Sequence, residues 1–226
     1  MANRDFIVFD FETGSRNPHK TQPTQIAAIA LDGRNLAMKG TFNSEIRPII
    51  NDDAAIAAGL DPLEEGALKV TGKNRKDLAK APTLKSVWRK FCTFVDKYNW
   101  KKDPFFNPIP VGYNIIGFDM VIINRLCKEY GPFDDVRQQQ KIFSKIHKCD
   151  VMDNMHMWTE GDPSIRSISM DTLRDRMGLS KENAHDALQD VKDTGNIFIK
   201  LLKTHRAVYQ EIELDKAFAN GKLYIK

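Results

Sequence analysis

Two acidic residues interrupt one of the most apolar segments of the chain, and they constrain what its first strand can become. The segment FIVFDFETG (residues 6–14) alternates with period two, so Asp10 and Glu12 fall on the same face of a strand. Two like-charged side chains near a core cost free energy unless a cation neutralises them. The segment therefore predicts either a metal site or, because Thr13 and Gly14 end the strand directly afterwards, a strand end at which both carboxylates are solvated.

The rest of the chain carries the periodicities of a mixed sheet covered by helices. The turn DGRN separates two strand-like segments, as in a β-hairpin, and Thr83 is a favourable N-cap for an apolar stripe at helical spacing. Further strands are expected at 24–32, 36–46, 109–113 and 147–152, and helices at 84–98, 119–130, 170–177 and 184–205. Strands that start as a meander and then alternate with helices predict an α/β fold with a mixed sheet of about five strands.

Length and composition predict one soluble domain. The 226 residues, of which 42% are hydrophobic, suit a single domain over residues 1–226, with a core from about 4 to 205 and a C-terminal extension at 206–226. A cytoplasmic protein with no membrane partner is expected, because the start has no cationic leader and apolar cleavage signal, and no segment is long and apolar enough to span a membrane. The three cysteines form no CxxC pair, so neither a disulfide framework nor a zinc site is indicated.

Positive charge is concentrated in one part of the sequence. Residues 69–102 hold eleven Lys and Arg against two Asp, although the whole chain has a net charge of only +4. Such a segment attracts a polyanion through phosphate neutralisation, but it is also typical of a solvated helix face. The charge run alone favours the solvated face.

Two later segments hold further candidate site residues. Asp119 is expected at a helix entry, where an Asp is commonly only a cap, and Asn114 in the preceding turn has a similar simple explanation. His185 and Asp190 are five residues apart, about 140° around an α-helix, so they can address one point only if His185 lies in or before the first turn. His185 with Asp186 also matches the metal dyad of HD-type phosphohydrolases, but the strand-rich start argues against that helical fold.

Taken together, the three segments resemble the DEDDh family of 3′–5′ exonucleases. The motifs of that family run in the same order: D-x-E on the first strand, an N-x₃₋₄-F-D element, and H-x₄-D near the start of a late helix. The stretches DFETGSRNPHKTQPTQIAAIALD, VGYNIIGFD and NAHDALQDV are most similar to the exonuclease I branch, and the likeness runs from about residue 4 to about residue 205. It implies an RNase H-like fold.

The resemblance also assigns roles. It implies that four carboxylates bind two Mg²⁺ ions, for which Mn²⁺ can substitute, and that His185 is the general base; the carboxylates are Asp10, Glu12, Asp119 and Asp190. It further implies substrate contacts from Thr13, Gly14, Tyr113, Asn114 and Phe118.

The expected activity is 3′–5′ hydrolysis of single-stranded DNA to nucleoside 5′-monophosphates. Two alternatives stay open: an exoribonuclease of the same family, similar to RNase T or oligoribonuclease, and a proofreading or nucleic-acid-binding module.

Overall fold

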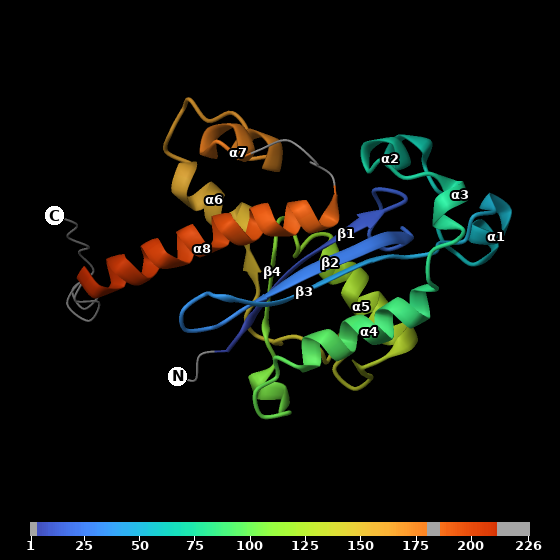
Figure 1. Ribbon diagram of the computed structural model, residues 1–226, viewed down its shortest axis with the longest axis horizontal. Helices are drawn as coiled ribbons and strands as arrows, with labels where there is room; N and C mark the ends of the chain where they lie inside the picture. The colour runs from blue at the N-terminus through green and yellow to red at the C-terminus, as the bar shows by residue number, and fades with distance from the viewer. Residues whose placement is uncertain (1–3, 180–185, 212–226) are drawn as a thin grey trace.

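The computed structural model describes residues 4–179 and 186–211, and its centre is a five-stranded mixed sheet with the order β3-β2-β1-β4-β7 (Figure 1). β1 pairs antiparallel with β2, and β2 with β3, whereas β4 runs parallel to both β1 and β7. The strands are β1 (Phe6–Thr13), β2 (Pro23–Leu31), β3 (Met38–Glu45), β4 (Ile109–Gly112) and β7 (Cys149–Asp150). This confirms the predicted α/β fold with a five-stranded sheet flanked by helices, and it removes the HD-type alternative, whose fold is helical.

Helices follow the strands as the periodicity predicted, with some additions. They are α1 (Asp52–Ala57), α2 (Glu65–Val70), α3 (Arg75–Leu78), α4 (Leu84–Asp96), α5 (Asp119–Tyr130), α6 (Val151–Thr159), α7 (Met170–Met177) and α8 (Ala187–Glu211). A 3-10 turn (Pro104–Phe106) and a two-stranded sheet of β5 (Phe133–Asp134) and β6 (Gln139–Gln140) complete the described elements. The sequence predicted neither α6 nor the small sheet, and α8 continues beyond the predicted end at residue 205.

The two faces of the central sheet bury different helices, because successive side chains of β1 alternate between them. Ile7, Phe9 and Phe11 pack in one core with α4 and α5. Phe6 and Val8 pack in a second core with α6, α7 and α8. The sheet thus lies between α8 and the pair α4 and α5 (Figure 1). Since Asp10 and Glu12 share the face of Val8, they point toward the side of the sheet that α8 covers.

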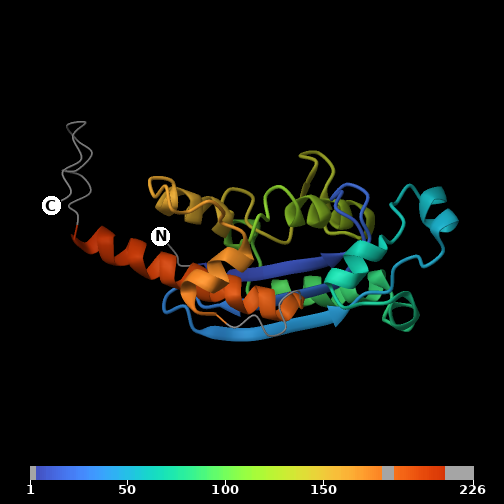
Figure 2. The same ribbon diagram turned by 90° about the horizontal axis from the view of Figure 1, so that it is seen from above.

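The positively charged run at residues 69–102 does not form one continuous face. Helices α1 to α3 gather at the end of the molecule opposite the last turns of α8 (Figure 2), and Arg75 ties them together. Its guanidinium donates to the carbonyl oxygens of Ile50 and Leu63, both at 2.7 Å, and pairs with Asp52 and Glu65. Arg75 is therefore a structural centre of this segment, whereas most of the other cations of the run are exposed, as expected for a solvated face.

Other cations of the run are neutralised locally. Lys80 pairs with Asp77, and Lys102 with Asp96, on the exposed surface.

Within the described ranges, no helix is long and apolar enough to cross a membrane.

Gly195 allows α8 to approach the sheet closely. A Cβ at this position would lie 2.7 Å from Ile29 Cδ1, nearer than van der Waals contact allows. We expect Gly195→Val to lower the free energy of unfolding by about 1–3 kcal/mol, because the added side chain overpacks the interface of α8 with β2. Denaturant unfolding measures the change. Gly66→Val is the control, since nothing lies within 4 Å of its Cβ position; equal losses in both variants would contradict the packing argument.

Candidate active site

Three carboxylates meet where β1 approaches the first turn of α8. Asp10 and Glu12 come from β1 and Asp190 from α8, and each offers an oxygen atom such that the three atoms lie within 4.8 Å of one another. The period-two alternation of β1 places the first two on one face, and the packing of α8 on that face brings the third. The structure therefore assembles three of the four metal ligands that the sequence predicted.

The fourth predicted ligand, Asp119, lies at the start of α5 and is buried beside Asp10. Its Oδ1 accepts a hydrogen bond from the backbone N–H of Phe11 at 3.1 Å, which fixes it against β1. Its charge is the strongest of the neighbouring charges that raise the pKa of Asp10. Asp119 is thus adjacent to the group of three oxygens, although it is not one of that group.

The carboxyl groups of the site hold their protons more tightly than ordinary acids. Burial raises the pKa of Asp10 well above its usual range, and the nearby charges of Asp119, Glu12 and Asp190 add to the effect. Burial, followed by the charge of Asp190, raises the pKa of Glu12 to about 7. Burial also raises the pKa of Asp119 to about 8.

This set of groups fits a hard divalent cation. Carboxylate oxygens are the donors that Mg²⁺ and Mn²⁺ prefer, and a cation would neutralise the charges whose repulsion adds to burial in raising these pKa values. Asp10, Glu12 and Asp190 are the residues placed to hold it, with Asp119 beside them.

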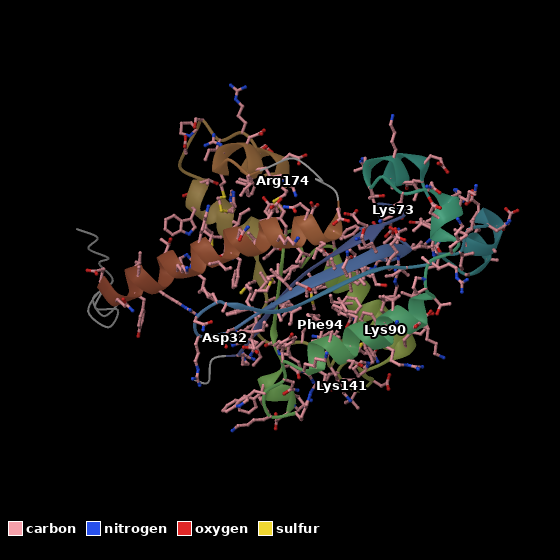
Figure 3. The ribbon with its side chains drawn as sticks, viewed as in Figure 1. Asp32, Lys73, Lys90, Phe94, Lys141 and Arg174 are labelled. Atoms are coloured by element: carbon pink, nitrogen blue, oxygen red, sulfur yellow. The ribbon has the colours of Figure 1, made fainter. Side chains whose placement is uncertain are left out.

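A buried arginine stands next to the acidic group. Arg174, on α7, is 1% exposed and donates to Asp190 Oδ1 at 2.6 Å, to Asp193 Oδ2 at 2.8 Å and to Asp171 Oδ1 at 3.1 Å. Its label in Figure 3 lies between α7 and the first turns of α8. Arg174 was not predicted from the sequence, because its partners on α8 lie 16 and 19 positions away and no local pattern marks them.

The predicted general base, His185, lies outside the described residues. The described chain resumes at Asp186, whose Oδ1 accepts from the backbone N–H groups of Leu188 and Gln189 and so caps α8. Asp186 Oδ2 accepts from Gln25 on β2, the residue that pairs with Glu12 across the sheet. The start of α8 is therefore fastened to the strand beside the acidic group.

Three of the predicted substrate contacts, Tyr113, Asn114 and Phe118, lie in the loop before α5, and a buried aspartate shapes that loop. Asp150 accepts from the backbone N–H groups of Asn114, at 2.9 Å, and Ile116, at 3.1 Å, while it also caps α6. Asn114 is exposed with φ +58°, and Phe118 packs partly buried against the core under α4 and α5. Asp150 was not predicted; its position directly before an apolar helical segment was the available signal.

Tyr113 of this loop and the two predicted contacts at the end of β1 are engaged within the protein. The hydroxyl of Tyr113 donates to the carbonyl of Ile168, and the hydroxyl of Thr13 donates to Ser15. The N–H of Gly14 donates to the carbonyl of Gln22, and its own carbonyl accepts from the N–H of Glu64.

One lysine of the basic run reaches the site. Lys73 lies in the loop between α2 and α3, and its positive charge lowers the otherwise raised pKa of Glu12. Its side chain is 10% exposed and its Nζ lies 3.5 Å from Glu45 Oε1. In Figure 3 its label lies beside the end of β1.

Comparison with known proteins agrees with this arrangement. Residues 7–198 match the family model RNase_T, described as an exonuclease. Among curated proteins, the chain is 23% identical over 203 residues to the DNA polymerase III subunit epsilon of Aquifex aeolicus, covering 90% of this chain and 83% of that protein. It is also 23% identical over 199 residues to the PolC-type DNA polymerase III of Caldanaerobacter subterraneus, covering 88% of this chain but only 12% of that one.

Solved structures of exonuclease I share the fold. A complex of the Escherichia coli enzyme with single-stranded DNA, in its zinc-bound form, has a TM-score of 0.67 at 21% identity, covering 89% of this chain and 41% of the enzyme. Exonuclease I from Methylocaldum szegediense has a TM-score of 0.63 at 21% identity, covering 96% of this chain and 43% of that one. The chain thus spans about two fifths of the length of these enzymes.

The likeness to these structures shows the fold, and the family model extends over most of the chain, including β1, α5 and the first turns of α8. The ordered motifs of the sequence fall on those elements. The chain therefore belongs to the exonuclease family described by the RNase_T model, with the acidic motifs of its DEDDh members.

Proposed function

We propose that this protein is a metal-dependent 3′–5′ exonuclease that hydrolyses single-stranded DNA to nucleoside 5′-monophosphates. The proposal rests on one observation: carboxylate oxygens of Asp10, Glu12 and Asp190 lie within 4.8 Å of one another, and Asp119 is buried beside them. Ordinary packing does not require four carboxylates so close together, and the raised pKa values of Asp10, Glu12 and Asp119 reflect the cost of burying three of them there.

Each residue then has a defined task. When bound, two Mg²⁺ ions supply charge neutralisation at the phosphate and at the departing 3′ oxygen. Asp10, Glu12, Asp119 and Asp190 hold the ions. His185, in its neutral form, accepts the proton of the attacking water.

Single-stranded DNA is the favoured substrate because exonuclease I, which shares this fold, has been solved in complexes with oligonucleotides. RNA is the alternative within the family, and it depends on how the site treats the 2′-hydroxyl.

A second candidate function is proofreading together with a polymerase. The chain covers 83% of the Aquifex epsilon subunit, against about two fifths of exonuclease I. The likeness to this polymerase subunit therefore extends over most of the subunit's length.

One assay separates these functions. Single-stranded DNA, duplex DNA, duplex DNA with a mismatched 3′ end, and RNA, each labelled at the 5′ end, are incubated with Mg²⁺, with and without chelator. We expect a ladder of shortened products from single-stranded DNA that chelator abolishes. Preferential trimming of the mismatched end would favour proofreading, trimming of RNA alone would favour an exoribonuclease, and no trimming of any substrate would refute the proposal.

We expect Asp10→Ala and His185→Ala to lose cleavage activity for different reasons. Asp10→Ala should abolish both Mn²⁺ binding and cleavage, because it removes a ligand. His185→Ala should lose roughly 10²–10⁴-fold in single-turnover rate, as is typical for a general base, while Mn²⁺ binding is kept. Calorimetry with Mn²⁺ alone and single-turnover cleavage at saturating Mn²⁺ measure the two effects. Near-normal cleavage by Asp10→Ala would contradict the metal assignment, and near-normal cleavage by His185→Ala would contradict the general base.

The stability of the metal-free protein should fall as pH rises toward neutrality. Glu12 has a folded pKa of about 7 against an ordinary value of 4.5, so the folded state binds this proton more tightly than the unfolded state. Its contribution to stability is complete below pH 4.5 and is lost as pH rises through about 7, and Asp119, with a pKa of about 8, extends the loss. Mg²⁺ should restore stability most at the upper end, because it binds the ionised carboxylates.

Thermal melts in chelator and in Mg²⁺, between about pH 5 and 8.5, test this dependence. Glu12→Gln should flatten the profile in chelator, whereas the exposed Glu160→Gln should leave it unchanged. A profile that rises with pH in chelator would contradict the raised pKa values.

Lys73 should contribute to substrate affinity more than the other lysines of its segment. Its positive charge acts on Glu12, near which a phosphate group of the substrate would be bound, and its side chain is 10% exposed, whereas the side chain of Lys80 is 71% exposed. We expect Lys73→Ala to weaken binding of single-stranded DNA and to reduce the slope of its salt dependence by about one, with Lys80→Ala as the matched control. Filter binding at several salt concentrations, in Ca²⁺ to prevent cleavage, measures both. Equal slopes for the two variants would remove Lys73 from the binding surface.

A further inference from the structure

Arg174 connects the acidic site to the interior of the protein. It is among the largest fully buried side chains, at 1% exposed, and each of its three nitrogen atoms donates to a different aspartate. One of these, Asp190, belongs to the candidate metal site, whereas Asp193 is 3% exposed and lies one turn further along α8. The third, Asp171, is on α7 itself, with a side chain that is 56% exposed.

Arg174 holds Asp190 in one orientation, because Arg174 is itself held by a buried carboxylate. A guanidinium is planar, so holding one edge determines the direction of the others. Asp193 Oδ2 accepts from Arg174 Nε, and Asp193 Oδ1 accepts from Gln189 Nε2 at 2.8 Å, so this partner is itself held. The direction in which Nη2 donates is then fixed, and its acceptor is Asp190 Oδ1 at 2.6 Å.

Stability alone does not account for this arrangement. Withdrawing a guanidinium and carboxylates from water costs about as much as their attraction returns, and packed apolar residues of similar volume commonly serve as well or better. Besides its effect on stability, a buried charge network beside a metal site restricts the orientation of the carboxylate that binds the metals. The residues that hold a ligand from behind typically change metal affinity by about 10–100-fold when removed.

We propose that Arg174 is a positioning residue, which holds Asp190 in the orientation that the metal ions require before they bind. This inference rests on the proposed function, because it assigns Asp190 to a metal site. Arg174 does not contact substrate or metal; it acts through Asp190, with Asp193 as its anchor.

The test compares Arg174→Met, Arg174→Lys and Asp193→Ala with Arg176→Met as the control. Arg176 lies on the same helix, is exposed, and makes one long hydrogen bond to the carbonyl of Ser164. Calorimetry with Mn²⁺ alone, well below the melting temperature, gives metal affinity without any contribution from cleavage. The Mn²⁺ concentration required for half-maximal cleavage gives the same quantity during turnover.

We expect Arg174→Met to weaken Mn²⁺ binding by about tenfold or more and to raise the Mn²⁺ requirement for cleavage in parallel. Arg174→Lys should recover part of the affinity, because an ammonium can still donate to Asp190 but lacks the rigid fork. Asp193→Ala should fall between Arg174→Met and the wild type, and Arg176→Met should match the wild type.

Unchanged or tighter Mn²⁺ binding in folded Arg174→Met would overturn the proposal and leave Arg174 with a packing role. If Arg174→Met does not fold, Arg174→Lys and Asp193→Ala decide, and normal Mn²⁺ affinity in both would overturn it. Failure of the proposed function looks different: the wild type itself would bind no Mn²⁺ or cleave no nucleic acid, and the inference about Arg174 would then fall with it.

Discussion

The mutual repulsion of four carboxylates at the end of β1 is the constraint on which the rest of the structure depends. Asp10 and Glu12 share a strand face, Asp119 is buried beside them, and Asp190 comes from another helix. Burial raises the pKa values of Asp10, Glu12 and Asp119, and the charges of neighbouring carboxylates add to the effect, so the group is unfavourable without a cation. The sheet and its two cores must therefore supply enough stability to hold the site together until a metal binds.

Packing around the site offsets the unfavourable free energy of grouping these carboxylates. One face of β1 is filled by aromatic residues, with Phe9 stacked on Phe143 at 5.2 Å between ring centroids. The other face is close to α8 because Gly195 removes the side chain that would separate them. Asp190 is thus carried by a helix whose distance from the sheet is set by packing, away from the charges themselves.

Much of the fold followed from periodicity, and the failures have specific physical causes. The alternation of β1 and the N-cap at Thr83 are local signals, and the structure confirms both. Most cations of the positively charged run are exposed, as expected, but Arg75 instead contacts residues far along the chain, such as Ile50, which the charge count did not predict. A count of charge in a sequence window cannot separate a cation in contact with solvent from one that binds backbone carbonyls.

In the site, too, some residues could be predicted from the sequence and others could not: the candidate ligands were predicted, and the groups that hold them were not. The carboxylates were found from motif spacing, because a metal site demands particular residue types at particular places. Arg174 and Asp150 were missed, because many residue types can hold a ligand or shape a loop, and only the three-dimensional arrangement reveals which one does. Asp150 accepts from the N–H groups of two loop residues and Arg174 donates to two positions of α8. The two therefore act on different parts of the site: Asp150 holds the loop before α5, from which substrate contacts are expected, and Arg174 holds the carboxylate of Asp190. In the function that we propose, the four carboxylates define the chemistry of the site, and these two residues would determine how precisely the site is assembled before an ion binds.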